Sequence, residues 1–238
     1  MSQKLEQARA AVDKAVERYA EHDVFRAGVQ SIPYIGGPID TLLSGRASRI
    51  QMKRLEQFVV DLRTRLERVE LIRADVSGDE FADFMLTAFE KVCRARTTEK
   101  RERFADIVAR QVIDAQRWGD AEMALRLVGD LEDIHIDVLC VALAASPATD
   151  AFAGIRIVAL DVQPGEGIIS NFSTSLVGIL GTRYSSVALR LACSELTARG
   201  LLHDEGVGRW DSIAMTYFVA TDLAEWLNDW LRQIEVTP

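Results

Sequence analysis

The sequence predicts a mainly α-helical protein with two parts, an N-terminal helical bundle and a C-terminal domain of helices with one small β-hairpin. Two observations carry this prediction. Apolar residues recur every three or four positions through most of the first 118 residues, which is the periodicity of amphipathic helices. From residue 131 onward, shorter apolar helical segments alternate with glycine turns, and the stretch IAMTYFVA at 213–220 is rich in β-forming residues.

Composition and charge are those of a globular protein. Of the 238 residues, 48% are hydrophobic and 27% charged, and the formal net charge is −8. Three widely separated cysteines in no metal-binding spacing are typical of a reducing compartment, and the charged N-terminus does not have the pattern of a secretory signal. No apolar run reaches the ~18–20 residues that a membrane-spanning helix needs. We therefore expect a cytoplasmic, bacterial protein, and its acidic balance disfavours nucleic-acid binding by the whole chain.

The N-terminal bundle is expected to contain four or five helices. Residues 2–22 have the periodicity of an amphipathic helix. Two later helices are predicted from their caps, one behind the capping box Ser77–Glu80 and one behind Thr97 or Thr98. Before these two helices, and after the apolar stretch that ends near residue 45, lies a heptad seam with spacings of three and four, which predicts a helix that pairs inside the bundle. The seam consists of Met52, Leu55, Val59, Leu62, Leu66 and Val69.

An unusual apolar stretch, SIPYIGGPIDTLLSGR at 31–46, precedes the heptad seam. Its glycines lack the spacing of a phosphate-binding loop, and Pro38 removes one backbone donor. Its uninterrupted apolar length of about thirteen residues is too short to cross a bilayer alone. We interpret 31–45 as a Pro/Gly corner that packs into the bundle, with membrane or partner contact as the alternative. The residues concerned are Ile32, Tyr34, Ile35, Ile39, Leu42 and Leu43.

The C-terminal domain is expected at 131–238, after a linker or short helix at 119–130. Its β-hairpin is predicted from LLHD and IAMTYFVA, which a glycine turn separates, whereas IRIVALDV is compatible with a strand or a helix end. Ser185 or Ser186 is expected to cap an amphipathic helix, and Thr221 the last one. The predicted helices are 131–145, 171–180, 185–199 and DLAEWLNDWLRQI from residue 222 onward.

No catalytic, cofactor or metal site is predicted. Nucleophilic catalysis requires a Ser or Cys beside a His base, and none of the three His residues lies in such a motif. Glu132 and His135 form one E-x-x-H, but a dimetal carboxylate site needs a second copy of it. We interpret the acidic run around them as the first turn of a helix, where negative charge suits the helix dipole. The chain is therefore expected to be non-enzymatic.

The segment LRLACSELTARGLLHDEGVGRW…TYFVATDLAEWLNDWL resembles the second half of winged-helix domains, in which a helix is followed directly by two wing strands and a closing helix. The resemblance covers about residues 131–235 and implies contact with DNA or with protein. In a DNA-binding role, the helix at 185–199 would be the recognition helix. Because the domain is acidic and its cations are few, a protein-contact role is favoured. The candidate nucleic-acid contacts are Arg183, Arg190, Arg199 and Arg209.

The front half carries a second resemblance. IPYIGGPIDTLLSG, the basic heptad helix behind it and EKRERFA are similar to a group of bacterial helical proteins, some of which are suspected of roles in defence against phage. This similarity covers residues 24–118 and brings no catalytic residue. We therefore expect a regulatory or interaction protein that self-associates through its helical bundle and its winged-helix-like domain, binds a protein partner, or does both. The alternatives are a DNA-binding transcriptional regulator and a defence effector that acts on a membrane through residues 24–44.

Overall fold

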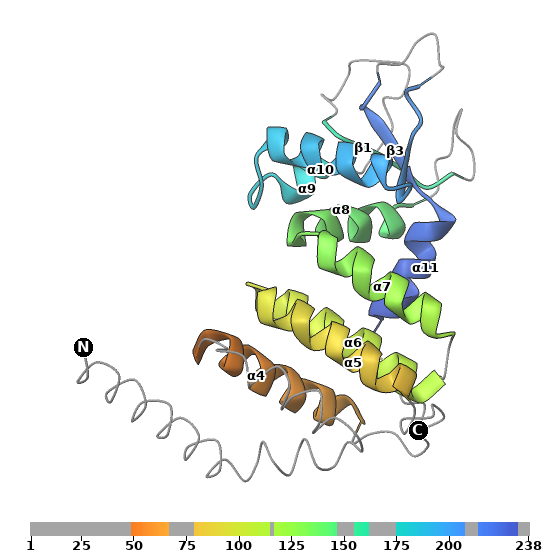
Figure 1. Ribbon diagram of the computed structural model, residues 1–238. Helices are drawn as coiled ribbons and strands as arrows, with labels where there is room; N and C mark the ends of the chain where they lie inside the picture. The colour runs from red at the N-terminus through yellow and green to blue at the C-terminus, as the bar shows by residue number, and fades with distance from the viewer. Residues whose placement is uncertain are drawn as a thin grey trace, which may run out of the picture. The chain divides into compact units, whose positions relative to one another are not determined.

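The computed structural model describes residues 49–66, 79–114, 117–146, 155–161, 175–207 and 214–232. Within these ranges the protein is mainly α-helical, with eight helices and one small antiparallel sheet, which confirms the predicted fold class (Figure 1). The chain divides into two compact units between Gly129 and Asp130. We call them the helical unit, up to Gly129, and the mixed unit, from Asp130 to Arg232. The helix predicted at 2–22 and the corner predicted at 31–45 lie outside the described residues.

The helical unit is built on the heptad helix. α4 packs against both α5 and α6, and the middle of the predicted seam, Leu55, Val59 and Leu62, is buried there. The seam therefore contributes to the core of its own unit. Residues 119–130, for which the sequence left a linker or a short helix open, lie in α7. The helices are α4 (Arg49–Leu66), α5 (Asp79–Arg94), α6 (Thr98–Asp114) and α7 (Trp118–Asp130), whose last residue begins the mixed unit.

Aromatic side chains dominate the core of the helical unit. Phe58 of α4 meets Phe89 of α5 edge to face, with ring centroids 5.9 Å apart. Trp118, the first residue of α7, has its ring 5.6 Å from Phe84 and 6.2 Å from Phe81, both on α5. Such pairs add a directional contribution to the burial of large apolar side chains. They join the start of α7 to α5.

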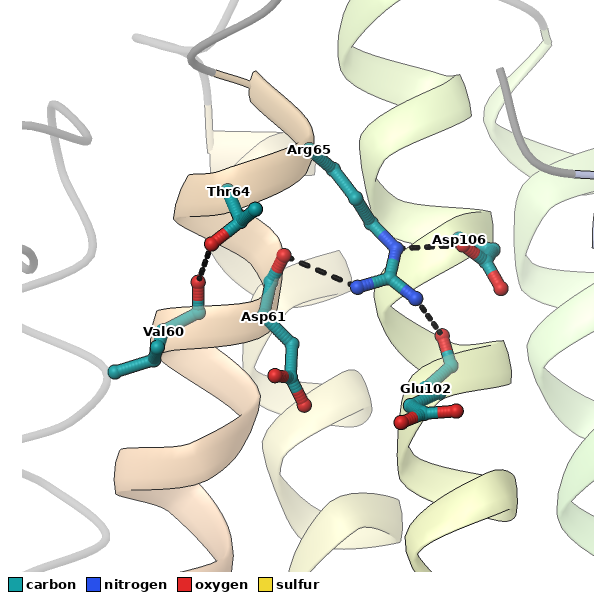
Figure 2. A network of polar contacts seen from close by, with 6 residues as sticks. All are labelled: Val60, Asp61, Thr64, Arg65, Glu102 and Asp106. Carbon is teal, nitrogen blue, oxygen red and sulfur yellow. Dashed lines mark hydrogen bonds and ion pairs between the residues drawn. The ribbon is translucent and has the colours of Figure 1, made fainter. Parts of the chain in front are cut away.

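One largely buried ion pair joins α4 to α6. Arg65 donates from Nε to Oδ1 of Asp106 at 2.5 Å, from Nη1 to the carbonyl of Asp61 and from Nη2 to the carbonyl of Glu102 (Figure 2). The side chains of Arg65 and Asp106 are only 22% and 10% exposed. Burial raises the pKa of Asp106 above its ordinary value, and the Arg65 guanidinium acts in the opposite direction. The guanidinium therefore offsets part of the cost of placing this carboxylate inside the unit.

The mixed unit contains a three-stranded sheet in the order β1-β3-β2. β2 and β3 form the predicted hairpin, with His203 opposite Val219. β1 pairs with the other side of β3, Val158 opposite Phe218, so IRIVALDV supplies a strand and the sheet has one strand more than expected. The elements are α8 (Asp133–Ala144), β1 (Ile157–Ala159), α9 (Leu176–Leu180), α10 (Ser186–Ala198), β2 (Leu202–Asp204), β3 (Tyr217–Ala220) and α11 (Asp222–Leu231).

Helix α8 is the centre of the mixed unit and contacts α9, α10, α11, β1 and β3 (Figure 1). Side-chain caps set the starts of the helices around it. The hydroxyls of Ser185 and Thr221 accept the N–H of Ala188 and Ala224, which fixes the first turns of α10 and α11. Ser175 is extended and caps α9 in the same way, so this helix begins at residue 176 and not at the predicted residue 171.

Candidate functional site

Helix α10 has a buried face and an exposed apolar face. Its buried face packs against α8, α9 and β2, and burial raises the pKa of the Cys193 thiol there to about 12, so the thiol stays an uncharged packing group at neutral pH. The buried residues are Leu189, Ala192, Cys193 and Leu196. On the other side, Val187 is 76% and Leu191 60% exposed. We use the name α10 stripe for the exposed residues Val187, Leu191, Ser194 and Ala198.

The α10 stripe is a continuous line along the helix. Its residues follow one another at intervals of four, three and four, which places them on one helical face. Single exposed apolar residues are normal on a protein surface. Here two bulky ones are aligned one turn apart and two small ones continue the line, which is the pattern of a helix that packs against another helix. The helix at 185–199 is therefore apolar on two faces, and not simply amphipathic as expected.

The predicted nucleic-acid contacts are not gathered on this face. Arg183 donates to Oδ2 of Asp137 on α8 at 2.6 Å, and the hydroxyl of Tyr184 donates to the same oxygen at 2.7 Å. The Arg183 guanidinium also lies 5.2 Å from the ring centroid of Tyr184. Burial, and then the Asp137 carboxylate, raise the pKa of Tyr184 to about 12, so the phenol remains a donor. These contacts hold the turn between α9 and α10 against α8.

The other candidate arginines differ in their surroundings. Arg199 pairs with Asp130 at 3.5 Å, and Arg209 lies outside the described residues. Arg190 is exposed beside the α10 stripe and forms no ion pair with any residue that the structure describes. A DNA-reading helix presents several donors to base edges. α10 offers only this one long cationic side chain between Val187 and Leu191.

The E-x-x-H motif caps α8. The Glu132 side chain accepts the backbone N–H of His135, and Nδ1 of His135 accepts the backbone N–H of Glu132 at 2.9 Å. Because Nδ1 accepts, the neutral ring has its proton on Nε2 and donates it to Oε2 of Glu195 on α10, 2.7 Å away. In the described part of the chain, no group of three His, Cys, Asp or Glu residues has the arrangement to hold a metal ion. The motif therefore joins α8 to α10.

Replacing His135 by alanine is expected to lower the free energy of unfolding of the mixed unit by about 1–3 kcal/mol. The substitution leaves the N–H of Glu132 without its acceptor and breaks the bond to Glu195. His135→Gln should cost less, because glutamine at this position completes a capping box in the usual way. Urea unfolding, monitored by hydrogen exchange of the α8 amides, measures the loss of stability in each variant. Equal losses in the two variants would show that the cap contributes nothing.

Sequence reasoning missed two residues of this region, Asp137 and Glu195. Each accepts a bond from a residue 46 or 60 positions away, so no local pattern marks them. The predicted membrane or partner residues from Ile32 to Leu43 lie outside the described residues. No helix that the structure describes is long and apolar enough to cross a membrane. No family model, curated protein or solved structure matches the chain.

Proposed function

We propose that the protein is a non-enzymatic interaction protein that self-associates through the exposed face of α10. The α10 stripe is the observation that carries this proposal. Val187 and Leu191 expose most of their apolar surface, although the opposite face of the same helix is already buried. Covering such a pair with another protein surface removes apolar area from water and provides the favourable free energy of association. The middle of the α4 seam, Leu55, Val59 and Leu62, is buried in its own unit, so the seam does not enter the proposal.

The order of elements supports a winged-helix-like role for the mixed unit. α10 is followed directly by β2 and β3, which pair with each other, and then by α11. This is the succession of helix, two wing strands and closing helix on which the sequence resemblance rests. Domains of that kind serve as protein-contact or dimerisation modules as well as DNA readers. In this proposal α10 has the position of a recognition helix, but its exposed chemistry suits an apolar protein surface.

A DNA-binding role is the second candidate, and one observation favours it. α9, the turn at 181–185 and α10 follow one another as in a helix-turn-helix, with exposed Arg190 on the second helix. Electrostatics oppose it, because residues 130–232 hold fourteen Asp/Glu against six Arg and no Lys. Salt-sensitive binding of a mixed-sequence duplex at micromolar protein, lost in Arg190→Gln, would favour this candidate over self-association.

The double variant Val187→Ser/Leu191→Ser is expected to weaken self-association at least about tenfold. Both side chains are exposed, so the substitutions remove apolar contact area between copies without opening a cavity in the fold. Sedimentation velocity over a micromolar concentration series measures the change, and circular dichroism checks the fold.

Val207→Ser is the matched control for that experiment. Val207 is 67% exposed in the same unit but lies in the turn after β2 and is not part of α10. Its replacement should leave the association constant unchanged. A wild-type chain that stays monomeric throughout the series, or an equal loss in Val207→Ser, would contradict the proposal.

A further inference from the structure

The α10 stripe has the spacing of a short coiled-coil seam. With Val187 at position d, the next three residues of the stripe fall at positions a, d and a of the heptad. In this register Arg190 occupies position g, and Glu195, five residues later, occupies position e. Positions e and g flank the seam, and charges there set partner choice and orientation. The helix therefore carries one positive and one negative side chain beside its exposed apolar line.

These two charges do not satisfy each other within one copy. Side chains meet along a helix at separations of three or four residues, whereas Arg190 and Glu195 are five apart. Arg190 is exposed and forms no ion pair with the described residues. Glu195 is 45% exposed at its side chain, and His135 donates to only one of its two carboxylate oxygens. Both charges are accessible to another molecule, and the bond from His135 restrains Glu195, which reduces the entropy that a contact would cost.

We infer that the partner on the α10 stripe is a second copy of this chain, paired in parallel so that Arg190 of each copy faces Glu195 of the other. This inference rests on the proposed function and adds the partner and the orientation. In a parallel pair, position g lies beside position e of the following heptad of the other helix, so the two-fold axis generates two ion pairs. An antiparallel pair that brings the same four stripe residues together places Arg190 opposite Thr197 and Glu195 opposite Ala188. That arrangement forms no ion pair between these positions. Charge complementarity therefore selects the parallel arrangement.

The small residues of α10 and the net charge of the mixed unit determine how closely two copies can approach and at what salt concentration their association is best measured. Ser194 and Ala198 are small, so the helices can approach closely along the second half of α10. The excess of eight carboxylates over arginines in residues 130–232 makes two copies repel each other. This repulsion is screened beyond about 8 Å at physiological ionic strength, whereas facing side chains of an ion pair lie within that distance. The association is therefore best measured at 0.15 M salt, where the near contacts outweigh the distant repulsion.

A charge exchange between copies tests the inference with the full-length chain. Arg190→Glu and Glu195→Lys should each weaken self-association by about five- to tenfold, because each places like charges together twice. An equimolar mixture of the two variants should restore association as a heterodimer, since both facing pairs become opposite in charge again. Fluorescence-detected sedimentation with one variant labelled measures the mixed species. Circular dichroism checks that each variant keeps the fold.

Glu195→Gln serves as a second variant, because glutamine retains an acceptor for His135 if lysine disturbs the fold. It should pair with Arg190→Glu better than Arg190→Glu pairs with itself. The parallel pairing is overturned if the mixtures with Arg190→Glu associate as weakly as Arg190→Glu alone, although Val187→Ser/Leu191→Ser still weakens self-association. That result would leave the proposed function standing. A monomeric wild-type chain overturns both.

Discussion

Replacing Phe84 by alanine is expected to lower the free energy of unfolding of the helical unit by about 3–5 kcal/mol. Phe84 is fully buried on α5, and its ring lies 5.6 Å from that of Trp118. The truncation therefore leaves a cavity and removes an aromatic contact that joins α5 to α7. Hydrogen exchange of the α5 and α6 amides measures the loss for this unit alone, since two units do not have to unfold in one transition.

Two further variants calibrate the Phe84 result. Phe84→Leu keeps most of the side-chain volume and should cost about 1–2 kcal/mol. Val60→Ala removes a side chain that is 49% exposed on α4 and should change the stability by no more than about 0.5 kcal/mol. If Phe84→Ala cost no more than Val60→Ala, the placement of Phe84 in the core would be wrong.

Replacing Arg65 by methionine is expected to destabilise the helical unit by about 2–4 kcal/mol. Methionine retains an apolar stem of similar length but removes the guanidinium that contacts Asp106 and the carbonyls of Asp61 and Glu102 (Figure 2). Asp106 is then a buried carboxylate without its cation. The double variant Arg65→Met/Asp106→Leu should recover most of the loss, because an apolar pair can replace a buried ion pair at little cost. Urea unfolding of wild type, Arg65→Met, Asp106→Leu and the double variant gives the coupling energy between the two side chains. If the effects of the two single variants were additive, the expectation would be contradicted.

The cost of Arg65→Met should also depend on pH, because it comes mainly from the charge on Asp106. Burial raises the pKa of Asp106 in the folded protein, and the Arg65 guanidinium lowers it in part, so removing Arg65 raises this pKa further. A carboxyl with a raised folded pKa destabilises the fold when ionised, and this penalty disappears below its unfolded pKa of about 3.9. The stability difference from wild type should therefore be largest near neutral pH and shrink as the pH falls. A difference that stays constant down to pH 3 would contradict this assignment.

The two units use their charged residues in different ways. In the helical unit, Arg65 reaches inward to offset a buried carboxylate. In the mixed unit, Arg183 and Arg199 pair with carboxylates of the same unit, which leaves Arg190 beside the exposed stripe. Two of the three described arginines that were expected to contact DNA thus have structural partners. This distribution is one reason that we propose contact with protein for the exposed face of α10.

The sequence by itself determined most of the described helices and many of their ends. Helical periodicity and capping are local, because the apolar face repeats within a few residues and a hydroxyl such as that of Ser185 or Thr221 reaches only the next turn. The β-hairpin was also predictable, since its two strands are close in the chain. The strand β1 was not, because three buried residues have no periodicity of their own and their partner β3 lies about 60 positions later.

Only the tertiary structure decided the chemistry of the candidate surface. The sequence LRLACSELTAR places apolar residues on two faces of α10, and nothing local determines which face is covered. Packing against α8 and β2 buries Leu189 and Leu196 and leaves Val187 and Leu191 outside. In the same way, E-x-x-H is compatible with a metal ligand or a helix cap until a partner is placed beside it. The partner is Glu195, 60 residues away in the chain, and only folding places it 2.7 Å from His135.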